Sequence, residues 1–284
     1  MTKGTDAELA VAAARAGAAV VREMYGERLA RFDKGAGDFA TTADLAAEQA
    51  ICDILRTARP DDAVTGEESG QSGASDAARR WLVDPLCGTL NYAARTMLVG
   101  VNVALRTGTE ITAAASADPF AEEVFWTDGE RAFLRGGTGT GDGTGDGTGT
   151  GDGTGDGDGS DEELTPSPDT RLVDVNLDPP FPNAPAFQAT RLLADPGFIA
   201  GFRPRVVSTS LAVAWVAAGR RAAYVTDGDL RDSVHFAAGI ALCRAAGCTV
   251  TGIHGQPLHT GAGGLLVASD PQTHAELLSL INNQ

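Results

Sequence analysis

Residues that can do chemistry gather in a few short segments of this chain. Asp84 ends a predicted strand, and Cys87, Gly88 and Thr89 follow it closely. An aspartate in this position could merely accept hydrogen bonds from turn amides. Because Glu68 lies in a second acidic segment and a Gly-Thr pair follows, we favour a functional site. Carboxylate oxygens are the ligands that Mg²⁺ prefers.

Cys87 and His235 are softer donors than these carboxylates. A cysteine is often only a small buried hydrophobe. At a helix N-terminus, its thiol pKa would instead fall, which would give a reactive thiolate able to act as nucleophile or ligand. His235 could cap a helix, contact a substrate or ligate an ion. Cys87, His235, Glu68 and Asp84 together would suit Zn²⁺, although nothing in their spacing requires it.

Four segments, in this order, resemble the sequence pattern of the inositol monophosphatase superfamily, a group of Mg²⁺-dependent, Li⁺-sensitive phosphatases. They are residues 38–44 (DFATTAD), 66–69 (GEES), 81–92 (WLVDPLCGTLNY) and 235–239 (HFAAG). Residues 216–219 (VAAG) and 223–224 (AY) are also similar to family motifs. The resemblance extends over the chain apart from a glycine-rich segment.

The resemblance implies an αβαβα sandwich with a phosphatase site. One Mg²⁺ would be held by Glu68, Asp84 and the carbonyl of Leu86. Thr89 would position the attacking water, and the Gly88–Thr89 backbone would face the phosphate at a helix start, where N–H groups point outward. The expected substrate-binding residues are Asp44, Asp84, Gly88 and Thr89. The expected catalytic residues are Glu68, Cys87, Thr89 and His235.

The same resemblance exposes two departures from the family pattern. A second Mg²⁺ would need Asp84 and two further aspartates, but Cys87 and His235 stand at those two positions. Two ions about 3.5–4 Å apart need carboxylates to offset their repulsion. Losing one good ligand commonly costs about 10–100-fold in affinity or activity. We therefore expect a degraded metal site with one weakly bound Mg²⁺ or none, unless Asp232, about one helical turn before His235, replaces a lost ligand.

The elements that must position these residues follow from the spacing of apolar residues. Helices are predicted at residues 7–25 and 42–57, the second with a capping box of Thr41 and Asp44. Short strand-like runs and two further helices come next, without the regular alternation of a doubly wound fold. This order favours a layered α/β fold with large, mostly antiparallel sheets. The predicted strands lie near residues 81–83, 98–105, 111–117, 124–126, 132–134, 172–176, 222–225, 249 and 265, and the helices at 210–218 and 234–246.

The glycine-rich segment divides the chain into an N-terminal part (1–135), a flexible linker (136–168) and a C-terminal part (169–284). Residues 136–163 carry eight acidic residues and nothing apolar, so they offer little to offset the entropy of ordering. A calcium β-roll would need a hydrophobic residue in each repeat. We expect an inert, mobile loop.

Composition limits the partners and the compartment. The net charge of −16 argues against nucleic acid, which requires a basic face. No run of about 20 apolar residues could span a bilayer, and no signal peptide opens the chain. The four cysteines form no disulfide framework, which favours the cytoplasm. The resemblance further implies a homodimer acting on a small anionic substrate.

Three functions are compatible with a degraded phosphatase site. The first is a biosynthetic enzyme that promotes elimination or intramolecular cyclisation of a phosphate or sulfate ester, because such steps need positioning and oxyanion stabilisation but no bound hydroxide. The alternative is a Mg²⁺-dependent phosphomonoesterase for inositol, sugar or nucleotide phosphates. The second alternative is a non-catalytic, ligand-binding relative.

Overall fold

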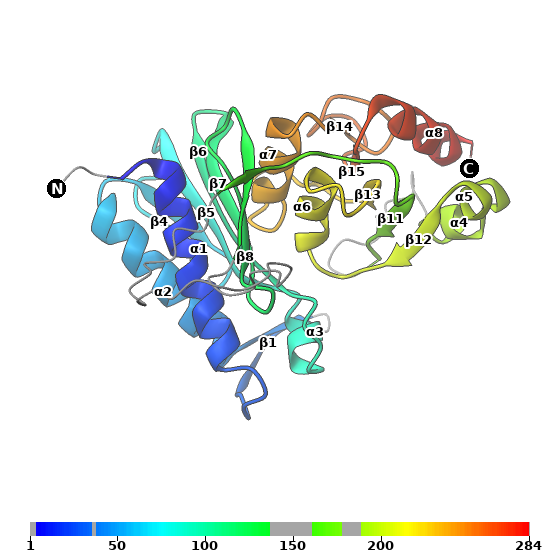
Figure 1. Ribbon diagram of the computed structural model, residues 1–284. Helices are drawn as coiled ribbons and strands as arrows, with labels where there is room; N and C mark the ends of the chain where they lie inside the picture. Colours follow the sequence, from blue (N-terminus) through cyan, green and yellow to red (C-terminus); the bar gives the residue numbers. More distant parts are fainter. Residues whose placement is uncertain (1–3, 36–37, 137–160, 178–188, 284) are drawn as a thin grey trace, which may run out of the picture.

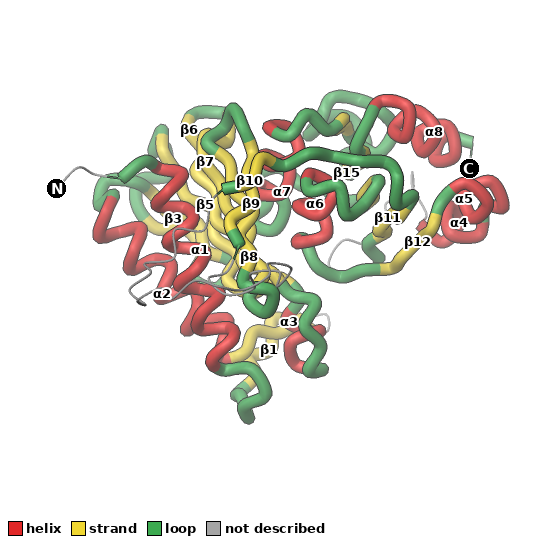
Figure 2. The backbone as a smooth tube through the Cα atoms, viewed as in Figure 1, coloured by secondary structure: helices red, strands yellow, loops and turns green. Residues whose placement is uncertain are grey.

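The computed structural model describes residues 4–35, 38–136, 161–177 and 189–283. Helices and sheets alternate in layers across the molecule: a helix pair, a sheet, a second helix pair, a second sheet and an outer helical layer (Figures 1 and 2). Buried apolar clusters fill the space between successive layers. The layered α/β sandwich predicted from the sequence is confirmed.

The first layer is the pair α1 (Asp6–Glu23) and α2 (Thr42–Ala58). The two helices approach closely because Gly17 lacks a side chain: a Cβ there would lie 2.6 Å from Cδ1 of Ile51. Helix α2 begins with the predicted capping box, in which the Thr41 hydroxyl accepts from the amide of Ala43 and the Asp44 carboxylate accepts from the amide of Thr41.

The first sheet has eight strands in the order β10-β9-β8-β7-β6-β5-β3-β4. Its pairs are antiparallel except β3 with β5, which run parallel. The strands are β3 (Ala63–Gly66), β4 (Gly70–Ser72), β5 (Arg79–Cys87), β6 (Gly100–Thr107), β7 (Glu110–Asp118), β8 (Glu123–Thr127), β9 (Ala132–Arg135) and β10 (Glu162–Glu163).

Helices α6 (Leu211–Ala217) and α7 (Ala237–Ala245) form the middle layer and pack on both sheets. The second sheet has the order β12-β11-β13-β15-β14 and is half parallel, so the expectation of antiparallel sheets holds less well there. Its strands are β11 (Leu172–Val175), β12 (Arg203–Val206), β13 (Ala223–Thr226), β14 (Thr249–Thr251) and β15 (Leu265–Ala268).

The outer layer consists of α4 (Ala189–Ala194), α5 (Pro196–Gly201) and α8 (Pro271–Asn282), none of which the sequence analysis predicted. Two small elements lie near the lower end of the first sheet in Figure 1: the hairpin of β1 (Arg31–Gly35) with β2 (Asp38–Thr41), and α3 (Thr89–Ala93). Among the described residues, no helix combines the length and apolar character that crossing a membrane requires.

Most of the predicted linker, residues 137–160, lies outside the described residues. The prediction of a free segment up to residue 168 is wrong at its C-terminal end. There β10 pairs with β9, Asp161 accepts from Arg135 (2.7 Å) and Trp126 (3.0 Å), and Leu164 is buried in the core around α6 and α7. The division at residues 135 and 169 stays a prediction, because the middle helices join both sheets into one core.

Candidate active site

An open pocket of about 730 Å³ lies where the ends of β5 and α3 meet the start of α6 and the segment before α7. It therefore contains parts of both halves of the chain. The residues that line it are Asp38, Glu67, Leu86, Cys87, Gly88, Thr89, Leu90, Asn176, Ser208, Thr209, Ser210, Tyr224, His235 and Phe236. Five of the predicted site residues are among them: Leu86, Cys87, Gly88, Thr89 and His235.

Glu67, and not the predicted Glu68, faces this pocket. The parallel register of β3 with β5 pairs Gly66 with Val83, and the Glu67 amide donates to the Val83 carbonyl (3.0 Å), which brings Glu67 beside Asp84. Glu68 points elsewhere and accepts from Lys34 at 2.7 Å. The prediction that Glu68 is the ligand is thus contradicted by its position. Lys34 also contacts Glu67, at 2.9 Å, so it lies at the edge of the site.

The turn that carries Glu67 is shaped by Glu48 of α2. The Glu48 carboxylate accepts from the amides of Glu68 and Ser69, both at 2.8 Å. Gly66 leaves room for this carboxylate, since a Cβ there would lie 2.5 Å from Oε2 of Glu48. The Gly-Glu-Glu-Ser sequence therefore fixes the backbone through its first residue and its amides, and presents only Glu67 to the pocket.

Asp84 lies beneath the pocket floor with its side chain fully buried. Its Oδ2 atom accepts from Nδ1 of His235 (2.9 Å) and from Nδ2 of Asn102 (3.3 Å). Asn102 also donates to Ser210 and accepts from Ser116. The sequence analysis missed Asn102, although an asparagine within the apolar run 101–105 is itself a signal, because a buried amide needs partners.

Thr89 is held from two sides at the start of α3. Its hydroxyl lies 2.9 Å from Oδ1 of Asp44 and 3.2 Å from the Leu86 carbonyl. Asp44 is fully buried and does not line the pocket, so the prediction that it binds substrate is wrong; its contact runs through Thr89. Gly88 adopts a φ of +104°, where a Cβ would meet the Leu98 carbonyl at 2.8 Å, which explains the glycine.

Cys87 and His235 come together on the opposite side of the pocket. The Cys87 sulfur accepts from the Ser210 amide at 3.2 Å and also contacts the His235 side chain. Asp84, Cys87 and His235 offer one ligand atom each, and these three atoms lie within 4.8 Å of one another. Cys87 and His235, distant in sequence, are thus joined through Asp84 into one cluster.

Electrostatics in this cluster follow from burial and from the charge of Asp84. Burial and Asp84 raise the pKa of the Cys87 thiol, which argues against the alternative of a reactive thiolate at a helix start. Burial opposes the imidazolium of His235, but the Asp84 carboxylate outweighs it and raises the His235 pKa well above its ordinary value. Burial, together with the charge of Asp84, raises the pKa of Glu67 to about 8.

The remaining candidates lie apart from the pocket. Asp232, considered as a replacement ligand, pairs with Arg106 at 2.6 Å and lines a different cavity. Asn91 donates to the carbonyls of Leu98 and Ser208. His254 contacts Asn282. His259 lies near Asp232 in the other cavity.

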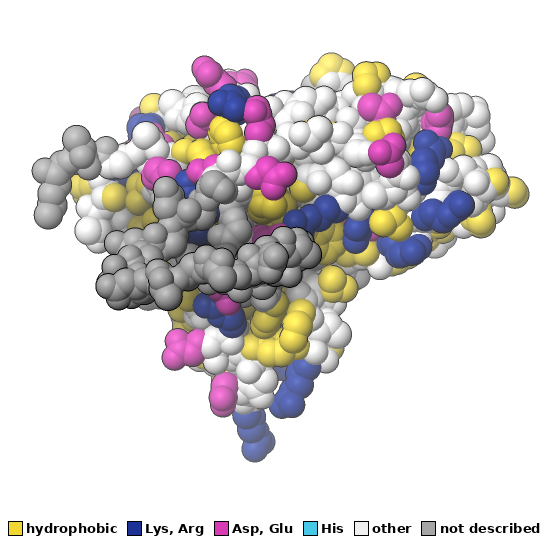
Figure 3. All heavy atoms as spheres, viewed as in Figure 1, with side chains coloured by type: hydrophobic (Ala, Val, Ile, Leu, Met, Phe, Trp, Pro, Cys, Tyr) yellow, Lys and Arg dark blue, Asp and Glu magenta, His cyan; other side chains and the backbone are white. Residues whose placement is uncertain are grey.

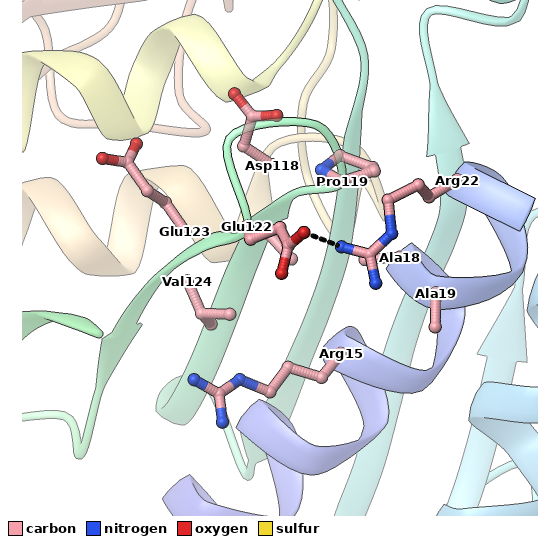
Figure 4. Close-up of a pocket in the computed structure, with 10 residues that line it drawn as sticks. Arg15, Ala18, Ala19, Arg22, Asp118, Pro119, Glu122, Glu123 and Val124 are labelled. Carbon is pink, nitrogen blue, oxygen red and sulfur yellow. Dashed lines mark ion pairs between the residues drawn. The ribbon is translucent and has the colours of Figure 1, made fainter. Parts of the chain in front are cut away.

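A separate pocket lies between α1 and the turn from β7 to β8 (Figure 4). It is lined by Arg15, Arg22 and Glu122 among others, and Arg22 pairs with Glu122 at 2.7 Å across its rim. Both side chains of this pair are about half exposed, so the pair is a surface salt bridge. Figure 3 shows both acidic and basic side chains on this face of the molecule.

The donors around Asp84 form two chemically different walls. The oxygen wall consists of Glu67, the Leu86 carbonyl and Thr89, the sulfur–nitrogen wall consists of Cys87 and His235, and Asp84 is shared by both. The carboxyl groups of Glu67 and Asp84 contact each other, and Oδ1 of Asp84 and Oε2 of Glu67 have no other hydrogen-bond partner among the described residues. Two buried carboxyl groups side by side need a shared proton or a cation to offset their repulsion. The oxygen wall therefore fits one Mg²⁺.

Comparison with known proteins agrees with this site. The model of the inositol monophosphatase family matches residues 4–284. The chain belongs to the inositol monophosphatase family. An inositol-1-monophosphatase of Caulobacter vibrioides is 39% identical over 128 residues, which cover 44% of this chain and 50% of that protein. The Nus factor SuhB of Escherichia coli K12 is 34% identical over 131 residues, 45% of this chain and 49% of that protein.

These matches thus span about half the length of the curated relatives. Solved structures extend the likeness to nearly the whole fold. The extragenic suppressor protein suhB of Bartonella henselae gives a TM-score of 0.78 at 25% identity, covering 96% of this chain and 97% of that chain. An IMPase of Thermotoga maritima gives 0.75 at 19% identity, covering 97% and 96%, a likeness of fold alone.

Proposed function

We propose that this protein is a Mg²⁺-dependent phosphomonoesterase that acts on a phosphate ester of a small molecule. The observation that carries the proposal is the contact between the buried carboxyl groups of Glu67 and Asp84, at a pocket that Thr89 also lines. This reading was the alternative in the sequence analysis. The family match favours it over elimination or cyclisation, because the curated relative of Caulobacter vibrioides is named as a monophosphatase.

Glu67, Asp84 and the carbonyl of Leu86 are the groups that would hold one Mg²⁺. A bound Mg²⁺ polarises a phosphoryl oxygen and stabilises the charge that develops on it. The amides at the start of α3 would donate hydrogen bonds to the remaining phosphate oxygens.

Thr89 would orient the attacking water. If its hydroxyl proton is directed to Asp44 (2.9 Å), its lone pairs remain free to accept a hydrogen bond from a water in the pocket. Asp44 is held in turn by Thr41, which donates from both its amide and its hydroxyl. The water is thereby fixed in position without a mobile side chain.

The test is release of phosphate from inositol 1-phosphate at millimolar Mg²⁺ in water enriched in ¹⁸O. Hydrolysis with cleavage of the P–O bond places one solvent oxygen in the phosphate, whereas elimination by C–O cleavage leaves all four original oxygens in place. We expect one labelled oxygen and a turnover below the usual range of about 1–10³ s⁻¹, since one cation position has lost its oxygen donors. Unlabelled phosphate would instead support the elimination reading.

Thr89→Ala should lower the rate by about 10²-fold or more, the contribution typical of a positioned proton-transfer group. Thr89→Ser should retain most of the activity because the hydroxyl is kept. Thr170→Ala is the matched control, since Thr170 contacts only the nearby amide of Leu172, away from the pocket. Equal rates for Thr89→Ala and the wild type would contradict the proposal.

A further inference from the structure

The sulfur–nitrogen wall does not fit a second Mg²⁺. Mg²⁺ demands near-octahedral oxygen ligands, and this wall offers a thiol and an imidazole. Thiolate and imidazole ligands select softer ions, above all Zn²⁺. We propose that Asp84, Cys87 and His235 form a binding site for Zn²⁺, so that the pocket holds two positions of different ion preference that share Asp84.

The distances are close to those of a tetrahedral zinc site. With Zn–N and Zn–O bonds of about 2.0–2.2 Å and Zn–S of about 2.3 Å, neighbouring ligand atoms lie about 3.3–3.7 Å apart. Nδ1 of His235 and Oδ2 of Asp84 are 2.9 Å apart, and all three ligand atoms lie within 4.8 Å of one another. Shifts of about 1 Å or less would therefore open the hydrogen-bonded cluster into a coordination site.

A second observation points to a cation at this cluster. The side chain of Asp84 is fully buried and contacts both the His235 imidazole and the carboxyl group of Glu67. Its negative charge is thus held in the interior beside a thiol and a second carboxyl group. A buried carboxylate is costly unless it is paired or coordinates a metal, and a cation at this cluster would offset the charge.

The surroundings supply what a zinc site needs beyond its ligands. Asn102 donates to Asp84, and the Ser210 amide donates to the Cys87 sulfur at 3.2 Å, so both ligands are oriented by outer partners. Cys87 and His235 also line the open pocket. Three protein ligands with one open position is the arrangement of a zinc site that can accept water or substrate.

The experiment uses the full chain after removal of metals with a chelator. Co²⁺ serves as the probe, because a thiolate-bound, four-coordinate Co²⁺ shows a near-ultraviolet charge-transfer band and intense visible bands. We expect one Co²⁺ per chain with both features, displaced by stoichiometric Zn²⁺ and retained in excess Mg²⁺. Failure to develop the thiolate band would overturn the proposal and would indicate a hydrogen-bonded cluster instead.

Two matched cysteine variants assign the band. Cys87→Ser should abolish it and weaken Zn²⁺ binding, measured by calorimetry, by about 10–100-fold. Cys248→Ser should change neither, since Cys248 is a partly buried free cysteine that does not line this pocket. A band lost in Cys248→Ser but kept in Cys87→Ser would overturn the assignment.

His235→Asn provides a second ligand test that leaves the thiol in place. It should shift the Co²⁺ spectrum and weaken Zn²⁺, and circular dichroism checks that the variant is folded. The experiment measures metal binding and not turnover. Its result therefore tests the zinc site independently of the proposed hydrolysis. An unchanged spectrum would show that the imidazole is not a ligand.

Discussion

The two walls of the pocket differ in how the chain builds them as well as in their donors. The oxygen wall is local to the first sheet: β3 and β5 lie side by side, and Glu67 and Asp84 follow from their register. The sulfur–nitrogen wall joins positions 87 and 235, from the end of β5 and the segment before α7. One backbone scaffold thus presents hard donors on one side and soft donors on the other.

This difference indicates that the donor atoms of each wall separately determine which ion that wall prefers. Asp84 belongs to both walls, because it contacts His235 through Oδ2 and also contacts the carboxyl group of Glu67. The charge of His235 also acts on Glu67, where it opposes the rise of the Glu67 pKa. The shared carboxylate is where the two walls are coupled, and the predictions below start from it.

Asp84→Asn should have the largest effect, because it removes charge from both walls at once. Mg²⁺ affinity by calorimetry and Co²⁺ binding by absorbance should each fall by about 10–100-fold, and phosphatase activity should be lost. Asp174→Asn is the matched control: this aspartate is equally buried, has one unpartnered oxygen and pairs with Arg221, but lies outside the pocket. Loss of only one ion's binding would assign Asp84 to a single wall.

Cys87→Asp combined with His235→Asp should convert the sulfur–nitrogen wall into an oxygen site. Three carboxylates around one position give a second Mg²⁺ the hard ligands it prefers. Each single change should do little, since a half-built site leaves the ion under-coordinated, so the gain should be non-additive. Mg²⁺ calorimetry on the wild type, both single variants and the double variant measures this. Two tightly bound Mg²⁺ ions in the wild type would contradict our account of this wall.

Glu67→Gln and Glu68→Gln sharpen the definition of the oxygen wall. Glu67→Gln should weaken Mg²⁺ by about 10–100-fold, because it removes a ligand charge. Glu68→Gln should change Mg²⁺ affinity only a few-fold, since it breaks a pair with the partly exposed Lys34. Mg²⁺ titration of both variants decides between them. A larger loss of Mg²⁺ affinity in Glu68→Gln would indicate that Glu68 is the ligand, as the sequence alone suggested.

The sequence predicted the elements whose patterns are local. Helices α1 and α2, the capping box at Thr41 and strands β5 to β9 follow from apolar spacing and short motifs, whereas β3, β4 and β10 of the same sheet were not predicted. The short outer helices α4 and α5 lack such a pattern. Helix α8 was missed although Asp270 followed by Pro271 is a helix-start signal, with Asp270 accepting from the amides of Gln272 and Thr273.

The sequence predicted which segments form the candidate site, but not which of their side chains face the pocket. The choice between Glu67 and Glu68 depends on the register of β3 against β5, which adjacent identical residues cannot reveal. The burial of Asp44 and the raised thiol pKa of Cys87 depend on what packs around them, including Asp84. Local motifs located the pocket, whereas tertiary packing decided which atoms face it.

The side chain of Asn91 reaches across the pocket rim, from α3 to the carbonyl of Ser208 ahead of α6. The two halves of the chain therefore meet at the same place where a ligand would bind. Any ion or ester that contacts both walls binds only when the halves are together. By mass action, such a ligand at 100 times its dissociation constant adds about 2.7 kcal/mol to the folded state. A ligand bound in the pocket therefore stabilises the whole fold, because it holds the two halves together.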